Sequence, residues 1–107
     1  MSAALWDRQA SFGIAPRSLE KLRALFDKTP GLRAVWIYGS RARGDHRPES
    51  DIDLAVDMPG GDYARLAVAV QDLELIYRVQ TVWLQSPLDA PFRGQIMRDR
   101  VLFWAPS

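Results

Sequence analysis

Apolar and polar positions follow two different periods along the chain. Between residues 18 and 28, and again between 62 and 78, apolar residues recur at helical spacing. Elsewhere, short apolar or alternating runs are rich in β-branched and aromatic residues, which is typical of strands. The pattern predicts helices over 18–28, over 62–78 and from residue 89 onward, and strands over 33–38, 51–57, 79–84 and 101–104. This order predicts an α+β domain with helices packed mainly on one face of a small mixed β-sheet.

Residue types at the ends of these segments support the boundaries. Ser18 is a suitable N-cap for the first helix, and Thr29-Pro30-Gly31 ends it. Asp62 can cap the second helix, and Pro91 suits the first turn of the last one. The run at 101–104 can form either an edge strand or a packed tail.

The composition indicates a single globular domain over residues 1–107. With 48% hydrophobic and 25% charged residues, the chain can bury one core but not two. Residues 1–15 show no clear period, and we expect a loosely ordered or packed N-terminal segment there. The net charge of +1 argues against a general nucleic-acid binder. The sequence has no cysteine, no signal-peptide pattern and no apolar run near the roughly 20 residues that cross a bilayer, so we expect a cytoplasmic protein without a membrane partner.

The most informative stretch is 38–57, which ends in the most regular alternation of the chain. A period of two places Asp51 and Asp53 on one face of the strand over 51–57, opposite its apolar positions. The two carboxylates then project side by side, within reach of one hard cation. Asp57, farther along the same face, is expected to be an ordinary strand-end carboxylate.

A basic loop that begins with Gly39 and Ser40 connects the two strands of this stretch. Glycine lets a backbone approach a ligand closely and present its N–H groups to phosphate oxygens. Each arginine of the loop can either contact phosphate or belong to a solvated surface. These arginines are Arg41, Arg43 and Arg47. His46 is expected to lie on the loop surface.

Together these residues resemble the signature of the DNA polymerase β-type nucleotidyltransferase superfamily. Their spacing, and the short chain, are most similar to the minimal nucleotidyltransferases, known as MNT proteins. The signature residues are Gly39-Ser40, Gly44 and Ser50-Asp51-x-Asp53-Leu54-x-Val56. The resemblance implies the nucleotidyltransferase fold, which is similar to the polymerase β palm.

The resemblance also implies roles for the residues of the signature. Asp51 and Asp53 correspond to the catalytic carboxylates that bind Mg²⁺ or Mn²⁺. The nucleotide, with ATP the expected substrate, is held through its phosphates. The residues expected to hold it are Gly39, Ser40, Arg41, Arg43 and Ser50.

One position departs from the resembling family. Family members usually carry a third Asp on the strand that corresponds to 79–84, beside the Asp pair. Gln80 occupies that position here, and no Asp or Glu lies between Ile76 and Leu88. An amide oxygen can ligate a hard cation, but it adds no negative charge and accepts protons poorly. Glu49 in the loop is a freer candidate for a third carboxylate.

The resemblance implies an enzyme whose acceptor is a hydroxyl group of a partner protein. MNT proteins are typically antitoxins of HEPN-domain toxins, and some add AMP from ATP to a tyrosine of the toxin. The alternative is a catalytically weakened nucleotidyltransferase fold, with Gln80 in place of the third Asp, that acts as an antitoxin or scaffold by binding alone. A third hypothesis, transfer to a small molecule such as an aminoglycoside, requires a second chain to complete the acceptor pocket. A homo-oligomer stays an open alternative.

Overall fold

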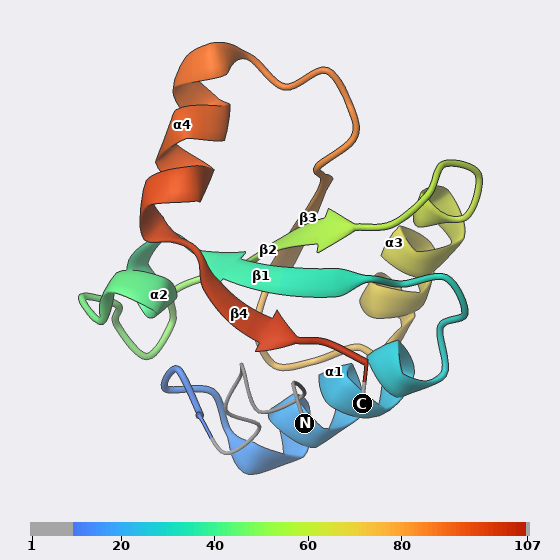
Figure 1. The fold of residues 1–107 in the computed structure, drawn as a ribbon. Helices are drawn as coiled ribbons and strands as arrows, with labels where there is room; N and C mark the ends of the chain where they lie inside the picture. Colours follow the sequence, from blue (N-terminus) through green and yellow to red (C-terminus); the bar gives the residue numbers. More distant parts are fainter. Residues whose placement is uncertain (1–9, 107) are drawn as a thin grey trace.

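The other elements are arranged around a four-stranded sheet. In the computed structural model, which describes residues 10–106, the strands are β1 (Ala34–Tyr38), β2 (Ile52–Asp57), β3 (Val79–Trp83) and β4 (Val101–Trp104). They lie in the order β3-β2-β1-β4 (Figure 1). β1 is antiparallel to β2 and β4, whereas β2 and β3 are parallel. The mixed sheet predicted from the sequence is confirmed, and the run at 101–104 is an edge strand.

Four helices connect or flank the strands. They are α1 (Pro16–Asp27), α2 (Ser40–Arg43), α3 (Tyr63–Asp72) and α4 (Ala90–Asp99). α3 lies in the crossover between β2 and β3, which a parallel pair requires. α4 begins as predicted, because the Asp89 carboxylate accepts a hydrogen bond from the Phe92 backbone N–H (2.8 Å) and Pro91 lies in the first turn. Within residues 10–106, no helix has the length and apolar character needed to cross a membrane.

One face of the sheet buries the main hydrophobic core. Ile52, Leu54 and Val56 of β2 are completely buried, as their alternation predicts. Burying such a side chain stabilises the fold by about 1.5–3 kcal/mol, so this face fixes the orientation of β2. Apolar side chains of α1 and α3 belong to the same core, among them Leu22, Phe26, Leu66 and Val70.

The other face carries a smaller apolar cluster beside polar residues. Ala55 of β2 and Tyr38 of β1 form this cluster with Ile96 of α4. The Tyr38 and Phe92 rings meet edge to face, with centroids 6.0 Å apart. α4 therefore covers part of this face, while α1 and α3 pack on the opposite one (Figure 1).

The predicted start of the first helix is wrong. α1 begins at Pro16 with Ala15 at the N-cap position, and Ser18 is buried inside the first turn. Proline suits this place because the first helical N–H has no partner within the helix anyway. Asp62 does precede α3, but its side chain makes no capping hydrogen bond.

α3 ends at Asp72, well before the predicted end near residue 78. Glu74 has a left-handed backbone conformation, with φ at 51°, which no continuing helix accommodates. Tyr77 is used in tertiary contacts instead. Its ring centroid lies 4.9 Å from the Arg41 guanidinium carbon, and its hydroxyl accepts a 2.8 Å hydrogen bond from the Ala15 backbone N–H. These contacts override the helical periodicity of the sequence.

Residues 10–15 are held firmly against the domain. Ile14 is only 2% exposed, and the Phe12 ring centroid lies 6.0 Å from that of Phe103 in β4. The Arg23 guanidinium donates to the Ala10 carbonyl oxygen at 3.0 Å. Of the two alternatives for the N-terminal segment, residues 10–15 take the packed one, and residues 1–9 lie outside the described part of the chain.

Candidate nucleotide and metal site

The predicted Asp pair lies at the start of β2, on the face of the sheet opposite the main core. In the register of the sheet, Asp53 is paired with Tyr38 of β1 on one side and Gln80 of β3 on the other. Asp51 directly precedes β2. Both aspartates are half-buried, whereas Ile52 between them is completely buried. The alternation read from the sequence thus places the two carboxylates together.

Two effects raise the pKa of Asp53. Burial is the larger, because it removes water from around the charged carboxylate, and the neighbouring negative charge of Asp51 adds to it. Both effects make the ionised pair energetically unfavourable by itself. A bound cation would offset both, so the electrostatics of the pair suit a metal site.

Tyr38 contributes a neutral hydroxyl beside Asp53. Burial, the charge of Asp53 and the nearby Tyr63 raise the pKa of Tyr38 to about 12. At neutral pH the phenol keeps its proton and remains a hydrogen-bond donor. Sequence reasoning missed Tyr38, although its place immediately before the Gly39-Ser40 turn was a signal that could have pointed to it.

Gly39 is required by both its conformation and its contact with Asp53. Its backbone has φ 78° and ψ −157°, a region that essentially only glycine adopts. A Cβ atom at this position would lie 2.7 Å from Oδ2 of Asp53. The glycine therefore brings the backbone of the turn directly against a carboxylate of the predicted metal site.

Ser40 begins α2, a single helical turn that the sequence analysis did not predict. The backbone N–H groups of Ala42 and Arg43 both donate to the Gly39 carbonyl oxygen, at 3.1 and 3.0 Å. Gly44 ends the turn in a left-handed conformation. Ser40 is half-buried at the first position of this turn, close in sequence to the Asp53 contact. A short Gly-rich stretch between two strands left too little periodicity to reveal the turn.

Two of the loop arginines, Arg41 and Arg43, have structural partners, whereas Arg47 is exposed. Arg41 is 2% exposed and donates to the carbonyl groups of Ser50 and Phe12, so these backbone groups already use its guanidinium. Arg43 lies on the surface, where it donates to Asp45 (3.2 Å) and to Asp99 of α4 (2.8 Å). These two hydrogen bonds raise the pKa of Arg43. A phosphate would have to compete with the carboxylates for this side chain.

Two further loop residues have assigned contacts. The Ser50 hydroxyl oxygen accepts a hydrogen bond from the Arg47 backbone N–H at 2.8 Å, which closes the loop before Asp51. His46 is not a free surface residue, because its ring packs against Gly13. A Cβ atom on Gly13 would lie 2.2 Å from the imidazole Nε2. Ser50 and His46 therefore both help to shape the loop.

Gln80 lies beside the Asp pair, on the strand predicted over 79–84. It is the β3 partner of Asp53, and its side-chain nitrogen donates to Oδ2 of Asp51 at 3.1 Å. Among residues 10–106, no group of three or more His, Cys, Asp or Glu side chains could hold a metal ion. The available donors are two carboxylates and one amide, all of which offer hard oxygen atoms. They fit Mg²⁺ or Mn²⁺, provided that the amide turns its oxygen toward the ion.

Asp57 and Glu49 stay outside this group. Asp57 accepts hydrogen bonds from Arg33 (3.3 Å) and Gln85 (2.8 Å) at the far end of β2, as expected of a strand-end carboxylate. Glu49 is exposed in the loop before Ser50. Within residues 10–106, Glu49 forms no hydrogen bond or ion pair with Asp51 or Asp53.

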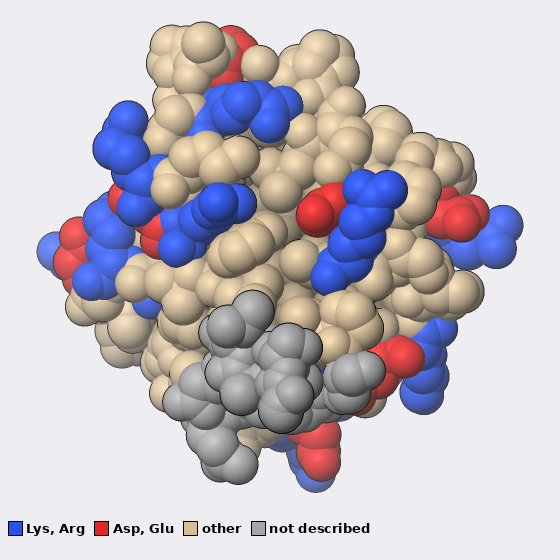
Figure 2. Space-filling view, in the orientation of Figure 1, with Lys and Arg blue, Asp and Glu red and all other residues tan. Residues whose placement is uncertain are grey.

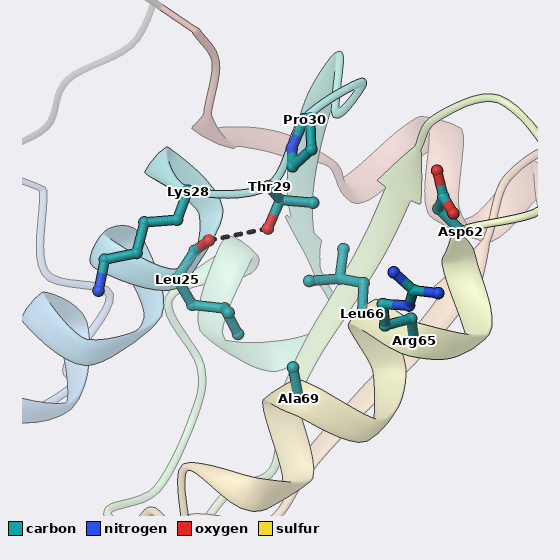
Figure 3. Close-up of a pocket in the computed structure, with 8 residues that line it drawn as sticks. All are labelled: Leu25, Lys28, Thr29, Pro30, Asp62, Arg65, Leu66 and Ala69. Atoms are coloured by element: carbon teal, nitrogen blue, oxygen red, sulfur yellow. Dashed lines mark hydrogen bonds between the residues drawn. The ribbon is translucent and has the colours of Figure 1, made fainter.

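A cavity of about 200 Å³ lies elsewhere, between α1 and α3 (Figure 3). Its apolar floor includes Leu25 and Leu66, and Lys28 and Arg65 stand at its rim. It belongs to the core side of the sheet and includes none of the predicted site residues. Basic side chains gather instead around α2 and α4, on the face shown in Figure 2, intermixed with acidic ones.

The family of the chain follows from a comparison with known proteins. Residues 20–106 match the family described as Polymerase beta, Nucleotidyltransferase. Among curated proteins, none matches. The matched range includes all of the sheet and the whole stretch from Gly39 to Asp53.

Solved structures share the fold over most of the chain. A candidate minimal nucleotidyltransferase is 34% identical with a TM-score of 0.55, and the alignment covers 79% of this chain and 87% of that one. A chain from a toxin–antitoxin complex with AMP-PNP is 26% identical with a TM-score of 0.62, over 82% and 73%. A chain from the complex of a tri-AMPylated HEPN toxin with an MNT antitoxin of Shewanella oneidensis is 22% identical with a TM-score of 0.55, over 83% and 71%. The fold, the site geometry and the family match agree, and the chain belongs to the polymerase beta nucleotidyltransferase family.

Proposed function

We propose that this protein is a metal-dependent nucleotidyltransferase that transfers AMP from ATP to a hydroxyl group of a partner protein. The observation that carries the proposal is the contact between Gly39 and Asp53, because it joins a phosphate-binding type of turn to a carboxylate pair. The raised pKa of Asp53 supports it, since a cation would relieve the unfavourable charge.

Each residue of the site has a proposed role. Asp51 and Asp53, with the amide oxygen of Gln80, would hold Mg²⁺ or Mn²⁺, which when bound neutralises triphosphate charge and orients the α-phosphate. Gly39 lets the backbone approach the phosphates, and the hydroxyl and N–H of Ser40 would bind them. Tyr38 has a raised pKa of about 12, so at neutral pH it would stay uncharged and add no negative charge beside Asp53.

The proposed partner is a HEPN-type toxin. The similarity to a chain of a toxin–antitoxin complex with AMP-PNP, an ATP analogue, supports a toxin as the partner and an adenine nucleotide as the substrate. In this proposal the acceptor hydroxyl belongs to the partner chain.

A second candidate is a nucleotidyltransferase fold that neutralises its partner by binding alone. The observation that favours it is the hydrogen bond from Gln80 to Asp51, because an amide satisfies that carboxylate without any cation. With a neutral group in place of the third carboxylate, an incoming hydroxyl would lack a strong proton acceptor.

The first experiment is calorimetric titration of ATP with excess Mg²⁺ into the wild type and into Asp51→Ala/Asp53→Ala. Binding by the wild type but not by the double variant supports the proposed site. Transfer of label from α-³²P-ATP to a co-purified HEPN-type partner then separates the enzyme from the binding module. Mg²⁺-ATP binding without any label transfer would favour the binding module, and absence of binding to a folded wild type, with or without partner, would exclude both metal and nucleotide roles.

A further inference from the structure

Arg41 is a buried cation in a position where the sequence suggests a surface ligand. It lies in α2, directly after Ser40, and is 2% exposed. Within the described residues, no carboxylate lies within ion-pair distance of its guanidinium. Burying a charge without a partner of opposite charge is expensive, so the contacts that it makes must be numerous.

The guanidinium is surrounded by backbone carbonyl oxygens. Its Nε and one terminal nitrogen both donate to the Ser50 carbonyl, at 3.1 and 2.9 Å. The same terminal nitrogen reaches the carbonyls of Pro48 (3.1 Å) and Arg47 (3.4 Å). The other terminal nitrogen donates to the Phe12 carbonyl at 3.0 Å. The Tyr77 ring covers the guanidinium at 4.9 Å.

These contacts connect the two halves of the candidate site. Arg41 is part of the turn that follows Gly39 and Ser40, while its forked hydrogen bond holds Ser50, the residue immediately before Asp51. It also fixes the loop over 47–50 and the segment that contains Phe12. One side chain thus sets the separation between the phosphate-binding turn and the first carboxylate.

We propose that Arg41 is a positioning residue, which locks the loop over 47–50 so that Asp51 is held at a fixed distance from the Gly39-Ser40 turn. The consequence for metal–nucleotide binding rests on the proposed function, whereas the locking of the loop does not. Arginine is required because its planar fork donates in three directions at once. Lysine has the charge but a single nitrogen, and methionine has neither.

The test uses Arg41→Lys and Arg41→Met, with Arg23→Lys and Arg23→Met as matched controls. Arg23 is also a buried arginine, 5% exposed, that donates to a carbonyl of the N-terminal segment and lies over an aromatic ring, but it is in α1 on the core side. Amide hydrogen exchange is measured by mass spectrometry without any ligand. We expect faster exchange in peptides covering 44–51 for both Arg41 variants and in neither Arg23 variant.

Mn²⁺ and Mg²⁺-ATP affinities provide the functional readout. Because residues that orient metal ligands typically change affinity by about 10–100-fold, we expect losses of that size for both Arg41 variants. The Arg23 variants should bind like the wild type even where they unfold more easily. Normal affinity in Arg41→Lys would mean that a positive charge at this position is sufficient. Normal affinity in Arg41→Met would mean that packing alone is sufficient. Either result would overturn the proposal.

A measurement on the unaltered protein covers the case in which Arg41 variants do not fold. The Nε–H of Arg41 should exchange with water at least about tenfold more slowly than that of the exposed Arg43, because local opening must precede exchange. Equally fast exchange would overturn the proposal. If the wild type binds neither Mn²⁺ nor Mg²⁺-ATP, the proposed function fails, while the exchange data still decide whether Arg41 locks the loop.

Discussion

Several single residues of the candidate site are unfavourable for the stability of the fold. Burial and the charge of Asp51 raise the pKa of Asp53. The backbone at Gly39 lies so close to the same carboxylate that a Cβ atom there would not fit. A protein selected only for stability would have little reason to keep this arrangement. Such sites often exchange stability for function, and two substitutions test this for the present site.

Gly39→Ala should abolish Mg²⁺-ATP binding and destabilise the fold by about 1–3 kcal/mol, the usual cost of forcing a side chain into a glycine-only conformation. Its Cβ would also lie 2.7 Å from Asp53 Oδ2, which must then move. Calorimetry and urea denaturation measure the two effects. Gly31→Ala is the control, because Gly31 also has a positive φ, 82°, but open space around it. It should lose stability and keep binding; equal binding by Gly39→Ala would remove the turn from the site.

Asp53→Asn should stabilise the metal-free protein at pH 7. Since the pKa of Asp53 is raised in the folded state, the folded protein holds this proton more tightly than the unfolded chain. Ionised Asp53 therefore lowers the free energy of unfolding. This loss is absent at low pH, where the carboxyl is protonated in both states, and it grows as the pH rises from the ordinary Asp pKa to the raised one. Urea denaturation in EDTA should therefore show a stability gain at pH 7 that disappears near about pH 3, below the ordinary Asp pKa.

Asp57→Asn serves as the control for this pH dependence. Asp57 lies on the same strand but pairs with the exposed Arg33, so its substitution should change stability by less than about 1 kcal/mol. A loss of stability in Asp53→Asn at pH 7 would mean that the carboxylate makes favourable contacts in the metal-free protein.

Among the elements, the strands were the easiest to predict. The alternation over 51–57 determines both the buried face and the direction of the Asp pair, and both agree with the structure because burial enforces the register. The end of α3 was not predictable, since Leu73 and Tyr77 continue the helical period although Tyr77 is used to contact Arg41 and Ala15. The burial of Arg41 was not predictable either, because its partners are backbone carbonyl groups, which every residue carries whatever its side chain.

Gln80→Asp is the prediction that belongs to β3. A third carboxylate beside Asp51 and Asp53 should destabilise the metal-free domain by about 1 kcal/mol, the free energy of roughly one pKa unit. Mg²⁺ should then raise the melting temperature more than it does in the wild type, because the added charge strengthens cation binding. Thermal unfolding with and without Mg²⁺ measures both. Gln95→Asp, an equal charge change at an exposed position of α4, should show neither effect. An identical response to Mg²⁺ in the two variants would separate Gln80 from the metal site.

At the scale of the whole molecule, contacts distant in sequence join the parts into one unit. The segment over 10–15 touches α1, β4, the loop after α3 and Arg41 of α2. Trp104 in β4 donates to Asp27 of α1 at 2.8 Å. With so many connections, the domain should unfold as a single cooperative unit.

Tyr77→Phe tests this connection. Removing the hydroxyl leaves the part-buried Ala15 N–H without its acceptor, which costs about 1–3 kcal/mol. Urea unfolding followed by circular dichroism and by tryptophan fluorescence should give coincident transitions, both shifted to lower urea. Tyr63→Phe is the control, because its hydroxyl forms a hydrogen bond with the Thr81 hydroxyl and not with a backbone N–H of residues 10–106, and its loss should cost less than about 1 kcal/mol. Separate transitions in Tyr77→Phe would mean that the N-terminal segment unfolds independently.

The short edge strand β4 has a consequence for the behaviour of the protein in concentrated solution. β4 has only four residues, is joined to β1 with an irregular register near Trp36, follows Arg100 and is soon followed by Pro106. A short, irregular edge with a charged residue at one end and a proline near the other offers few backbone groups to a foreign strand. The β4 edge of the sheet is thereby protected against growth by strand addition and against the aggregation that such growth begins.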